Sequence, residues 1–457
     1  MKGYLNNKQI RYILFHLGQH LDLHNGIQEK FVFIPDTNES TGFADSIVFP
    51  LSSSEINTGE IMSVDDIPIL FPVSTERTFY RMEGSSLVFN HDLLKSAFYL
   101  LSGYQERKVP SIDKLGRFDF GNSIQHKLGF TSKPIVNYYF KIISDGILEY
   151  CRLHNINIKE RHEPGSFFFT LTHDVDRIRY YTINTFVYQI KQFAGLAGRN
   201  KPAGFYLKES LSTLAGILLK KQDNDPYWNF RELLDLERKL GIRSTWFMLP
   251  RDVKHTDSYY NLSDKRIKEL TLLIREDGHE IALHGTVRSH RSATAMREIR
   301  EKFSSAFGFK PSGIRQHRLM WEHPQTALIH AETGFIYDST LGFAQHEGFR
   351  NSYCNPFRLY DFEKDEMLPV WEIPLTVMDA TLFYYRKLGL QQARENIINI
   401  IEEVRRFNGI FNLLWHNSYF DEKDVPGITE FYVNLLNGIK EMNPSINTCS
   451  GLVNSMI

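Results

Sequence analysis

The chain has 457 residues, of which 42% are hydrophobic and 23% charged, and its formal net charge is −1. A chain of this length exceeds the size at which one hydrophobic core usually keeps growing, so two domains are expected. The near-zero charge argues against a nucleic-acid-binding protein, and three widely spaced cysteines, Cys151, Cys354 and Cys449, argue against a disulfide scaffold.

The amino-terminal part is expected to form a smaller α+β domain over residues 1–160. Its predicted elements are two helices, over 9–17 and 93–101, and two strands, over 30–34 and 60–69. The first residues lack the continuous apolar core of a signal peptide, and no run is long enough for a transmembrane segment. The sequence therefore predicts a cytoplasmic protein. The charged, turn-rich segment 160–166 marks the expected domain boundary.

A barrel domain is predicted for residues 161–457, where short apolar runs alternate with amphipathic patterns. Strands are predicted over 167–172, 244–249, 279–283, 313–314, 335–337, 373–378 and 410–415. Helices are predicted over 230–240, 264–277, 293–307 and 388–407. This alternation is typical of a parallel sheet with crossover helices, and the length fits a TIM-like barrel. An open doubly wound sheet is disfavoured, because no glycine-rich phosphate loop follows the first strand.

An insertion over 182–221 interrupts this alternation. Its basic residues are Lys191, Arg199, Lys201, Lys208, Lys220 and Lys221, and its acidic residue is Glu209. Aromatic residues are interleaved with these charges. The insertion is either a solvated face of ordinary helices or a peripheral element that contacts anionic lipid or a phosphate-bearing substrate.

The predicted strands end in residues that bind metals, transfer protons or hold carboxylates. Asp174 and Asp176 follow the first strand, and His284, Arg315 and His416 end three later ones. Because loops after parallel strands share one face of a barrel, these side chains are expected to converge. Two aspartates at this spacing can supply a metal ligand and a base, although aspartates after strands also serve as turn formers and helix caps.

The order of these motifs resembles that of the polysaccharide deacetylase family, carbohydrate esterase family 4. The matching segments are Thr172-His173-Asp174-Val175-Asp176, Gly278 to Gly285, Gly313-Ile314-Arg315 and Leu413 to Asn417, and the resemblance spans 167–457. It implies an α/β fold, a distorted (β/α)7 barrel. It also implies a hydrolase of carbon–nitrogen bonds that removes acetyl groups from sugars with a divalent metal, commonly Zn²⁺.

The resemblance also implies roles for individual residues. Asp174 matches the catalytic base, Arg315 the residue that orients it, and His416 the general acid. Asp176 and His284 match metal ligands. Apart from the resemblance, His317, Asp338, Asp379 and Trp415 are candidates for substrate binding. Asp338 and Asp379 end strands and either orient a histidine or bind a sugar hydroxyl, with helix capping as the alternative, and core packing is the alternative for Trp415.

The third metal ligand departs from the family pattern. The second histidine of the family's motif lies four residues after the first, where this chain has Arg288. His290, six residues along, is our first candidate, on the condition that the segment is not helical. His317 is the second candidate, and Arg288 in place of the ion is the third. Without a metal, the barrel would be an inactive carbohydrate-binding or scaffold protein in polysaccharide biosynthesis.

A second resemblance concerns the amino-terminal part. The segments 96–106, Gly116-Arg117-Phe118 and Pro134-Ile135-Val136 are similar to an uncharacterised amino-terminal domain attached to a bacterial subgroup of deacetylase-like proteins. That subgroup is associated with surface polysaccharide synthesis. The expected partner is therefore a carbohydrate, either free or linked to a lipid or a nucleotide.

Overall fold

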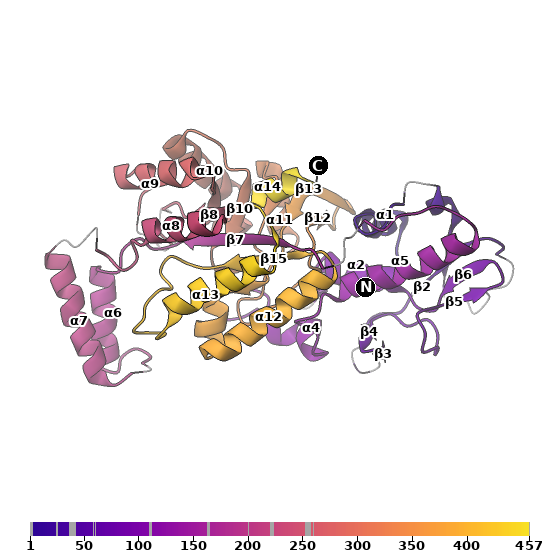
Figure 1. The fold of residues 1–457 in the computed structure, drawn as a ribbon, viewed down its shortest axis with the longest axis horizontal. Helices are drawn as coiled ribbons and strands as arrows, with labels where there is room; N and C mark the ends of the chain where they lie inside the picture. Colours follow the sequence, from indigo (N-terminus) through magenta and orange to yellow (C-terminus); the bar gives the residue numbers. More distant parts are fainter. Residues whose placement is uncertain are drawn as a thin grey trace.

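Two lobes and a projecting helical hairpin make up the computed structural model (Figure 1). It describes residues 3–23, 26–35, 43–57, 59, 61–108, 112–161, 165–199, 201–219, 224–251, 257–258 and 260–456. Within these residues, no helix combines the length and apolarity needed to cross a bilayer.

The amino-terminal lobe is α+β, as predicted. Its sheet has the order β1 (Phe31–Pro35), β2 (Ile47–Leu51), β6 (Ser86–Phe89), β5 (Tyr80–Glu83), with only the β5–β6 pair antiparallel. Its helices are α1 (Asn7–Leu17), α2 (Leu93–Leu101), α3 (Tyr104–Lys108), α4 (Ile124–Lys127) and α5 (Ile135–Leu153). The predictions of helices at 9–17 and 93–101 and of a strand at 30–34 are confirmed.

The single strand predicted over 60–69 is wrong. The chain forms a hairpin there, with β3 (Met62–Val64) antiparallel to β4 (Ile67–Ile69), and residue 60 lies outside the described residues. Asp65 and Asp66 turn the chain with φ of 49° and 63°. Aspartate tolerates this left-handed conformation better than most residues, so the pair reads as a turn rather than as part of a strand.

The second lobe is a distorted (β/α)7 barrel, as predicted. Its parallel strands are β7 (Phe168–Val175), β8 (Ser244–Met248), β9 (Glu280–Gly285), β10 (Gly313–Gln316), β11 (Tyr337–Asp338), β13 (Glu366–Glu372), β14 (Val377–Met378) and β15 (Ile410–Leu414). β12 (Phe357–Asp361) adds an antiparallel strand beside β13, and β16 (Ser445–Ile446) pairs with β7.

One continuous segment, 366–378, closes the barrel. Its first half, β13, pairs with β11, and its second half, β14, pairs with β15. Between them, Ile373 N–H donates to Asp338 O at 2.9 Å and Thr376 N–H donates to Asn412 O at 3.3 Å. The segment therefore fills the position between β11 and β15, and its change of partner is the distortion.

Helices surround the barrel. They are α8 (Phe230–Leu240), α9 (Lys265–Glu276), α10 (Ala293–Phe307), α11 (Gln325–Thr333), α12 (Leu390–Arg406), α13 (Ile428–Glu441) and α14 (Cys449–Asn454). The ends of α10 show why the predicted bounds hold. Ser292 Oγ accepts a hydrogen bond from Ala295 N–H at the amino end, and Gly308 ends the helix with φ of 79°, a conformation that costs glycine little.

The two lobes share a hydrophobic core. Buried residues of α1, α2 and α5 belong to the same apolar cluster as Trp321, Tyr353 and Phe357 of the barrel lobe. Polar contacts border this cluster, because Arg350 forms a two-pronged ion pair with Glu106 at 2.7 Å for each bond. The amino-terminal lobe is therefore packed against the barrel as part of one structure.

Candidate metal centre and active site

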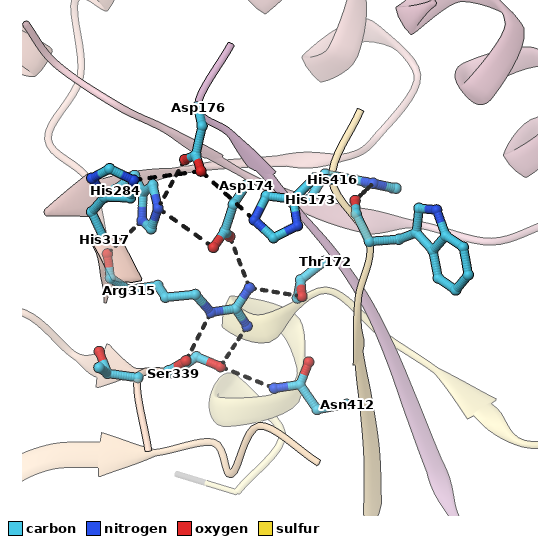
Figure 2. Close-up of polar contacts among 12 residues, drawn as sticks. Thr172, His173, Asp174, Asp176, His284, Arg315, His317, Ser339, Asn412 and His416 are labelled. Carbon is cyan, nitrogen blue, oxygen red and sulfur yellow. Dashed lines mark hydrogen bonds and ion pairs between the residues drawn. The ribbon is translucent and has the colours of Figure 1, made fainter. Parts of the chain in front are cut away.

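The site begins at the carboxyl end of β7. Thr172 and Asp174 lie two positions apart on this buried strand, so their side chains project to the same side. Asp176 follows directly after the strand. Asp174 is buried, whereas the side chain of Asp176 keeps 23% of its surface exposed. Figure 2 shows the two carboxylates together, and their exposures place Asp174 deeper and Asp176 nearer the mouth.

Arg315 of β10 fixes the deeper carboxylate. Its Nη1 donates to Asp174 Oδ1 and to Thr172 Oγ1, both at 2.9 Å, while Nε and Nη2 bind the carbonyl and hydroxyl oxygens of Ser339 at 2.8 and 2.9 Å. The guanidinium also lies 4.4 Å from the centre of the Phe247 ring. Since Arg315 is fully buried, its charge requires the Asp174 carboxylate as a partner.

His284 of β9 has one ring nitrogen occupied and one free. Its Nδ1 donates to the Arg315 carbonyl at 2.7 Å, which leaves Nε2 with its lone pair directed into the site. Nε2 lies 3.4 Å from Asp174 Oδ2 and 3.3 Å from Asp176 Oδ1. Both Nε2 and Asp176 Oδ1 are buried without a hydrogen-bond partner, which is costly unless a ligand satisfies them.

His317, at the end of β10, completes the cluster. Its Nδ1 lies 2.9 Å from Asp257 Oδ1, and the other oxygen of Asp257 accepts a hydrogen bond from Val287 N–H at 3.1 Å. This carboxylate therefore fixes the ring and leaves Nε2 facing Asp176 Oδ2 at 3.5 Å. A carboxylate behind the histidine is the usual outer partner of a metal-binding imidazole.

One ligand atom from each of Asp176, His284 and His317 lies within 4.8 Å of the others. Two imidazoles and one carboxylate form a donor set that suits zinc and related divalent ions, with coordination positions left open for water or substrate. The two unpartnered buried atoms belong to this set. The residues thus fit the divalent ion that the sequence motifs lead us to expect.

The electrostatics of the cluster favour a bound cation. Burial opposes ionisation of Asp176, but the charges and hydrogen bonds of His317 and His284 outweigh it and hold its pKa well below the usual value. Burial alone would lower the pKa of His317, whereas Asp176 and Asp257 raise it to about 9. The carboxylates therefore stabilise positive charge at this position, and a metal ion would take the place of the proton on His317.

His416 borders the cluster from the end of β15. Its Nδ1 lies 2.8 Å from Asp379 Oδ1, its backbone N–H donates to Asp379 Oδ2 at 2.5 Å, and its Nε2 lies 3.7 Å from Asp176 Oδ2. Burial lowers the pKa of His416, but Asp379, Asp176 and Asp174 together raise it to about 10. Asp379 is fully buried and holds this histidine, which is the first of the two roles expected for it, rather than lying open to a sugar hydroxyl.

The structure does not bring His290 into the cluster. It lies in the short 3₁₀ helix Ser289–Arg291, where its Nδ1 bonds the Val287 carbonyl at 2.7 Å and its Nε2 accepts from the Arg291 guanidinium at 3.0 Å. Both ring nitrogens are occupied. The second candidate, His317, lies where we expected a third ligand.

Two other candidates for substrate binding also lie away from the mouth. Asp338 is fully buried, pairs with His330 and accepts a hydrogen bond from Thr340 N–H. Trp415 is fully buried and packs against Tyr432, with ring centres 4.9 Å apart. Core packing therefore accounts for this tryptophan.

The amino-terminal lobe supports the loop that carries His317. Arg318 and Leu319 adopt φ of 60° and 56°, a strained conformation for residues with a side chain. Arg117, from the amino-terminal lobe, donates to the Arg318 carbonyl at 3.2 Å and pairs with Asp113 at 2.6 Å. Arg117 lies in the segment Gly116-Arg117-Phe118, and no role was expected for it from the sequence.

Asp257 was not among the expected site residues. It lies in the long loop after β8, well beyond the positions directly after a strand that the sequence pattern singles out. Its loop position at the carboxyl end of a barrel strand was the one available signal.

Comparisons with known proteins agree with the expected resemblances. Residues 6–151 match the model of a family described as "Family of unknown function (DUF7033)", as expected for an uncharacterised amino-terminal domain. No curated protein matches the chain.

Similar solved structures belong to deacetylases and their relatives. A candidate polysaccharide deacetylase from Mycobacterium smegmatis is 20% identical with a TM-score of 0.42, over 64% of this chain and 91% of that one. A family 4 pseudoenzyme from Bacillus anthracis is 11% identical with a TM-score of 0.33, over 64% and 66% of the two chains. The family 4 carbohydrate esterase PdaA of Bacillus subtilis is 11% identical with a TM-score of 0.33, over 65% and 84%.

Proposed function

We propose that this protein is a metal-dependent deacetylase that hydrolyses an N-acetyl or related acyl group on a carbohydrate, in the cytoplasm. The carbohydrate would be an intermediate of surface-polysaccharide synthesis, linked to a lipid or a nucleotide. One observation carries the proposal: Asp176, His284 and His317 form a cation site flanked by the Asp174–Arg315 pair and by His416. We propose Zn²⁺ as the ion, because two imidazoles and a carboxylate with open positions form one of the ligand sets of catalytic zinc.

The side chains around the cluster divide the proton transfers between them. A divalent ion held by Asp176, His284 and His317 would supply Lewis acidity toward water and the acyl oxygen. Asp174 is the base, because Arg315 holds its carboxylate in a fixed orientation through a hydrogen bond of 2.9 Å. His416 is protonated near neutral pH and donates a proton to the departing nitrogen, with Asp379 holding its ring.

Metal content tests the cluster directly. We expect the purified protein to bind one divalent ion near stoichiometry, and His284→Ala and His317→Ala to lose it. His290→Ala is the matched control, because the ring of His290 is bonded elsewhere, and it should retain the ion. Loss of the ion from His290→Ala but not from His317→Ala would contradict this ligand set. A protein that takes up no ion under any loading condition would instead support the scaffold alternative.

Acetate release tests the reaction. Sugar nucleotides, lipid-linked sugars and short oligosaccharides with N-acetyl groups should be offered to the metal-loaded protein. Removing a positioned general acid or base costs roughly 10²–10⁴-fold in rate, so Asp174→Asn and His416→Ala should lower turnover by that order. Both variants should keep their bound ion, because neither removes a proposed ligand. Full activity in both would exclude these roles.

A further inference from the structure

A helical hairpin leaves the barrel between β7 and β8. Its helices, α6 (Ile183–Phe193) and α7 (Ala203–Leu218), lie side by side and project from the lobe (Figure 1). An ion pair, a hydrogen bond and a tightly packed ring attach the hairpin to the barrel lobe. Glu209 of α7 binds Lys423 Nζ at 2.6 Å and Tyr180 Oη at 3.3 Å, and the Tyr181 ring occupies the space beside Gly216.

The two faces of α7 are reversed relative to an ordinary surface helix. The buried face carries polar and small residues together with one tyrosine: Tyr206, Glu209, Ser210, Thr213 and Gly216. Another face of the helix exposes a leucine stripe, defined as Leu207, Leu211, Leu214 and Leu218. These leucines recur at the spacing of one helical face, and Leu211 and Leu218 are 59% and 72% exposed. The helix therefore attaches through its polar side and presents its apolar side outward.

This exposure is concentrated in the hairpin. Of the twenty large hydrophobic residues that are exposed in the described part of the chain, ten lie between Ile183 and Leu219. Isolated exposed leucines are ordinary on a protein surface, but a concentration of this kind marks an interaction surface.

The charge of the hairpin indicates what covers it. Residues 182–221 hold six basic residues and one acidic residue. The acidic residue, Glu209, is buried and paired with Lys423, whereas Lys191, Arg199 and Lys208 are exposed. Exposed apolar side chains beside exposed positive charge complement the surface of a bilayer that contains anionic lipid. A second copy of the same hairpin would instead bring like charges together.

We propose that the α6–α7 hairpin is a membrane-docking element that lies on the surface of anionic bilayers, with the leucine stripe inserted among the lipids. Ile183 follows Asp176 by seven positions, so a chain that extends by at most ~3.6 Å per residue keeps the hairpin base within about 25 Å of the site. If the proposed deacetylase function holds, docking favours a lipid-linked carbohydrate as the substrate, and this last step rests on that function.

Vesicle co-sedimentation with the full-length protein tests docking without reference to activity. We expect binding to vesicles of phosphatidylcholine mixed with phosphatidylglycerol, little binding to phosphatidylcholine alone, and weaker binding as salt is raised. The double variant Leu211→Ser/Leu214→Ser should lower binding by about tenfold or more, since each leucine loses its transfer into lipid. The matched control is Leu272→Ser on α9, which is 56% exposed and should bind as wild type does.

A second double variant controls for loss of vesicle binding that is caused by misfolding of the leucine variant. Lys191→Gln/Lys208→Gln leaves the leucine stripe intact and should also weaken binding to the anionic vesicles, with an unchanged circular dichroism spectrum. Equal binding by wild type and both double variants would overturn the proposal. So would a wild-type dimer in light scattering that Leu211→Ser/Leu214→Ser converts to a monomer, because a second copy would then cover the stripe. Deacetylation that fails while vesicle binding persists would refute the proposed function alone.

Discussion

Substitution of Asp257 by asparagine isolates the contribution of a residue that is not itself a metal ligand. In the structure, one oxygen of Asp257 accepts from His317 Nδ1 at 2.9 Å and the other accepts from Val287 N–H at 3.1 Å. Asparagine keeps the size of the side chain but has one acceptor oxygen and one donor group. It therefore cannot accept both hydrogen bonds.

Either orientation of the amide weakens the metal site. If the oxygen stays with Val287, the amide NH₂ faces His317 Nδ1 and favours the tautomer with its proton on Nε2, the atom that faces Asp176. If the oxygen stays with His317, the buried Val287 N–H loses its acceptor, which costs about 1–3 kcal/mol. Substitution of such outer partners typically lowers metal affinity by about 10–100-fold, equivalent to ~1.4–2.8 kcal/mol.

Competition titration of the apo-protein against a chromophoric zinc chelator near neutral pH measures this loss. Asp264→Asn is the matched control, because Asp264 is exposed at the start of α9 and its side chain makes no capping bond there. His317→Ala supplies the value for complete loss of the ligand. An unchanged affinity in Asp257→Asn, or an equal loss in Asp264→Asn, would refute the role that we assign to Asp257.

Arg117→Ala removes the hydrogen bond that Arg117 donates to the Arg318 carbonyl, and it should lower zinc affinity several-fold in the same titration. An unchanged affinity would show that the loop holds its conformation without this contact. Asp379→Asn removes the strongest of the charges that raise the pKa of His416 to about 10, so the alkaline limb of the kcat/KM profile should move to lower pH; a limb that stays in place would contradict this pairing. Burial lowers the pKa of His323 from 6.5 to about 4. At pH values between about 4 and 6.5, the unfolded chain therefore binds more protons than the folded chain. The free energy of unfolding should fall by up to about 3 kcal/mol as pH is lowered from about 6.5 to about 4, as measured by denaturant titrations. In His323→Gln this loss should be smaller, and an equal pH dependence would show that other groups cause it.

The barrel could be predicted from the sequence because its strands are short apolar runs and its helices carry one apolar face. The prediction failed where the pattern is not local. The run at 373–378 was expected to be one strand, but it is the second half of a segment whose first half pairs on the other side. β12 was not predicted either, and it pairs antiparallel with β13, the first half of the same segment.

The part of the site that is built from residues at the ends of strands could be predicted from the sequence. Asp174, Asp176, His284, Arg315 and His416 come together because parallel strands end on one face of the barrel. The choice between His290 and His317 could not be made from spacing. It depends on a 3₁₀ turn that directs His290 to Val287 and on the backbone after β10, which a contact from another lobe supports.

Because the two lobes share a core, neither is expected to be stable when it is produced or inherited without the other. A barrel produced from residue 161 onward would expose Trp321, Tyr353 and Phe357 to water, and the separated amino-terminal half would lack the surface that covers α1 and α2. Each fragment alone would therefore be prone to aggregation and proteolysis. Recombination that separates the halves should be selected against, and both should melt in a single cooperative transition.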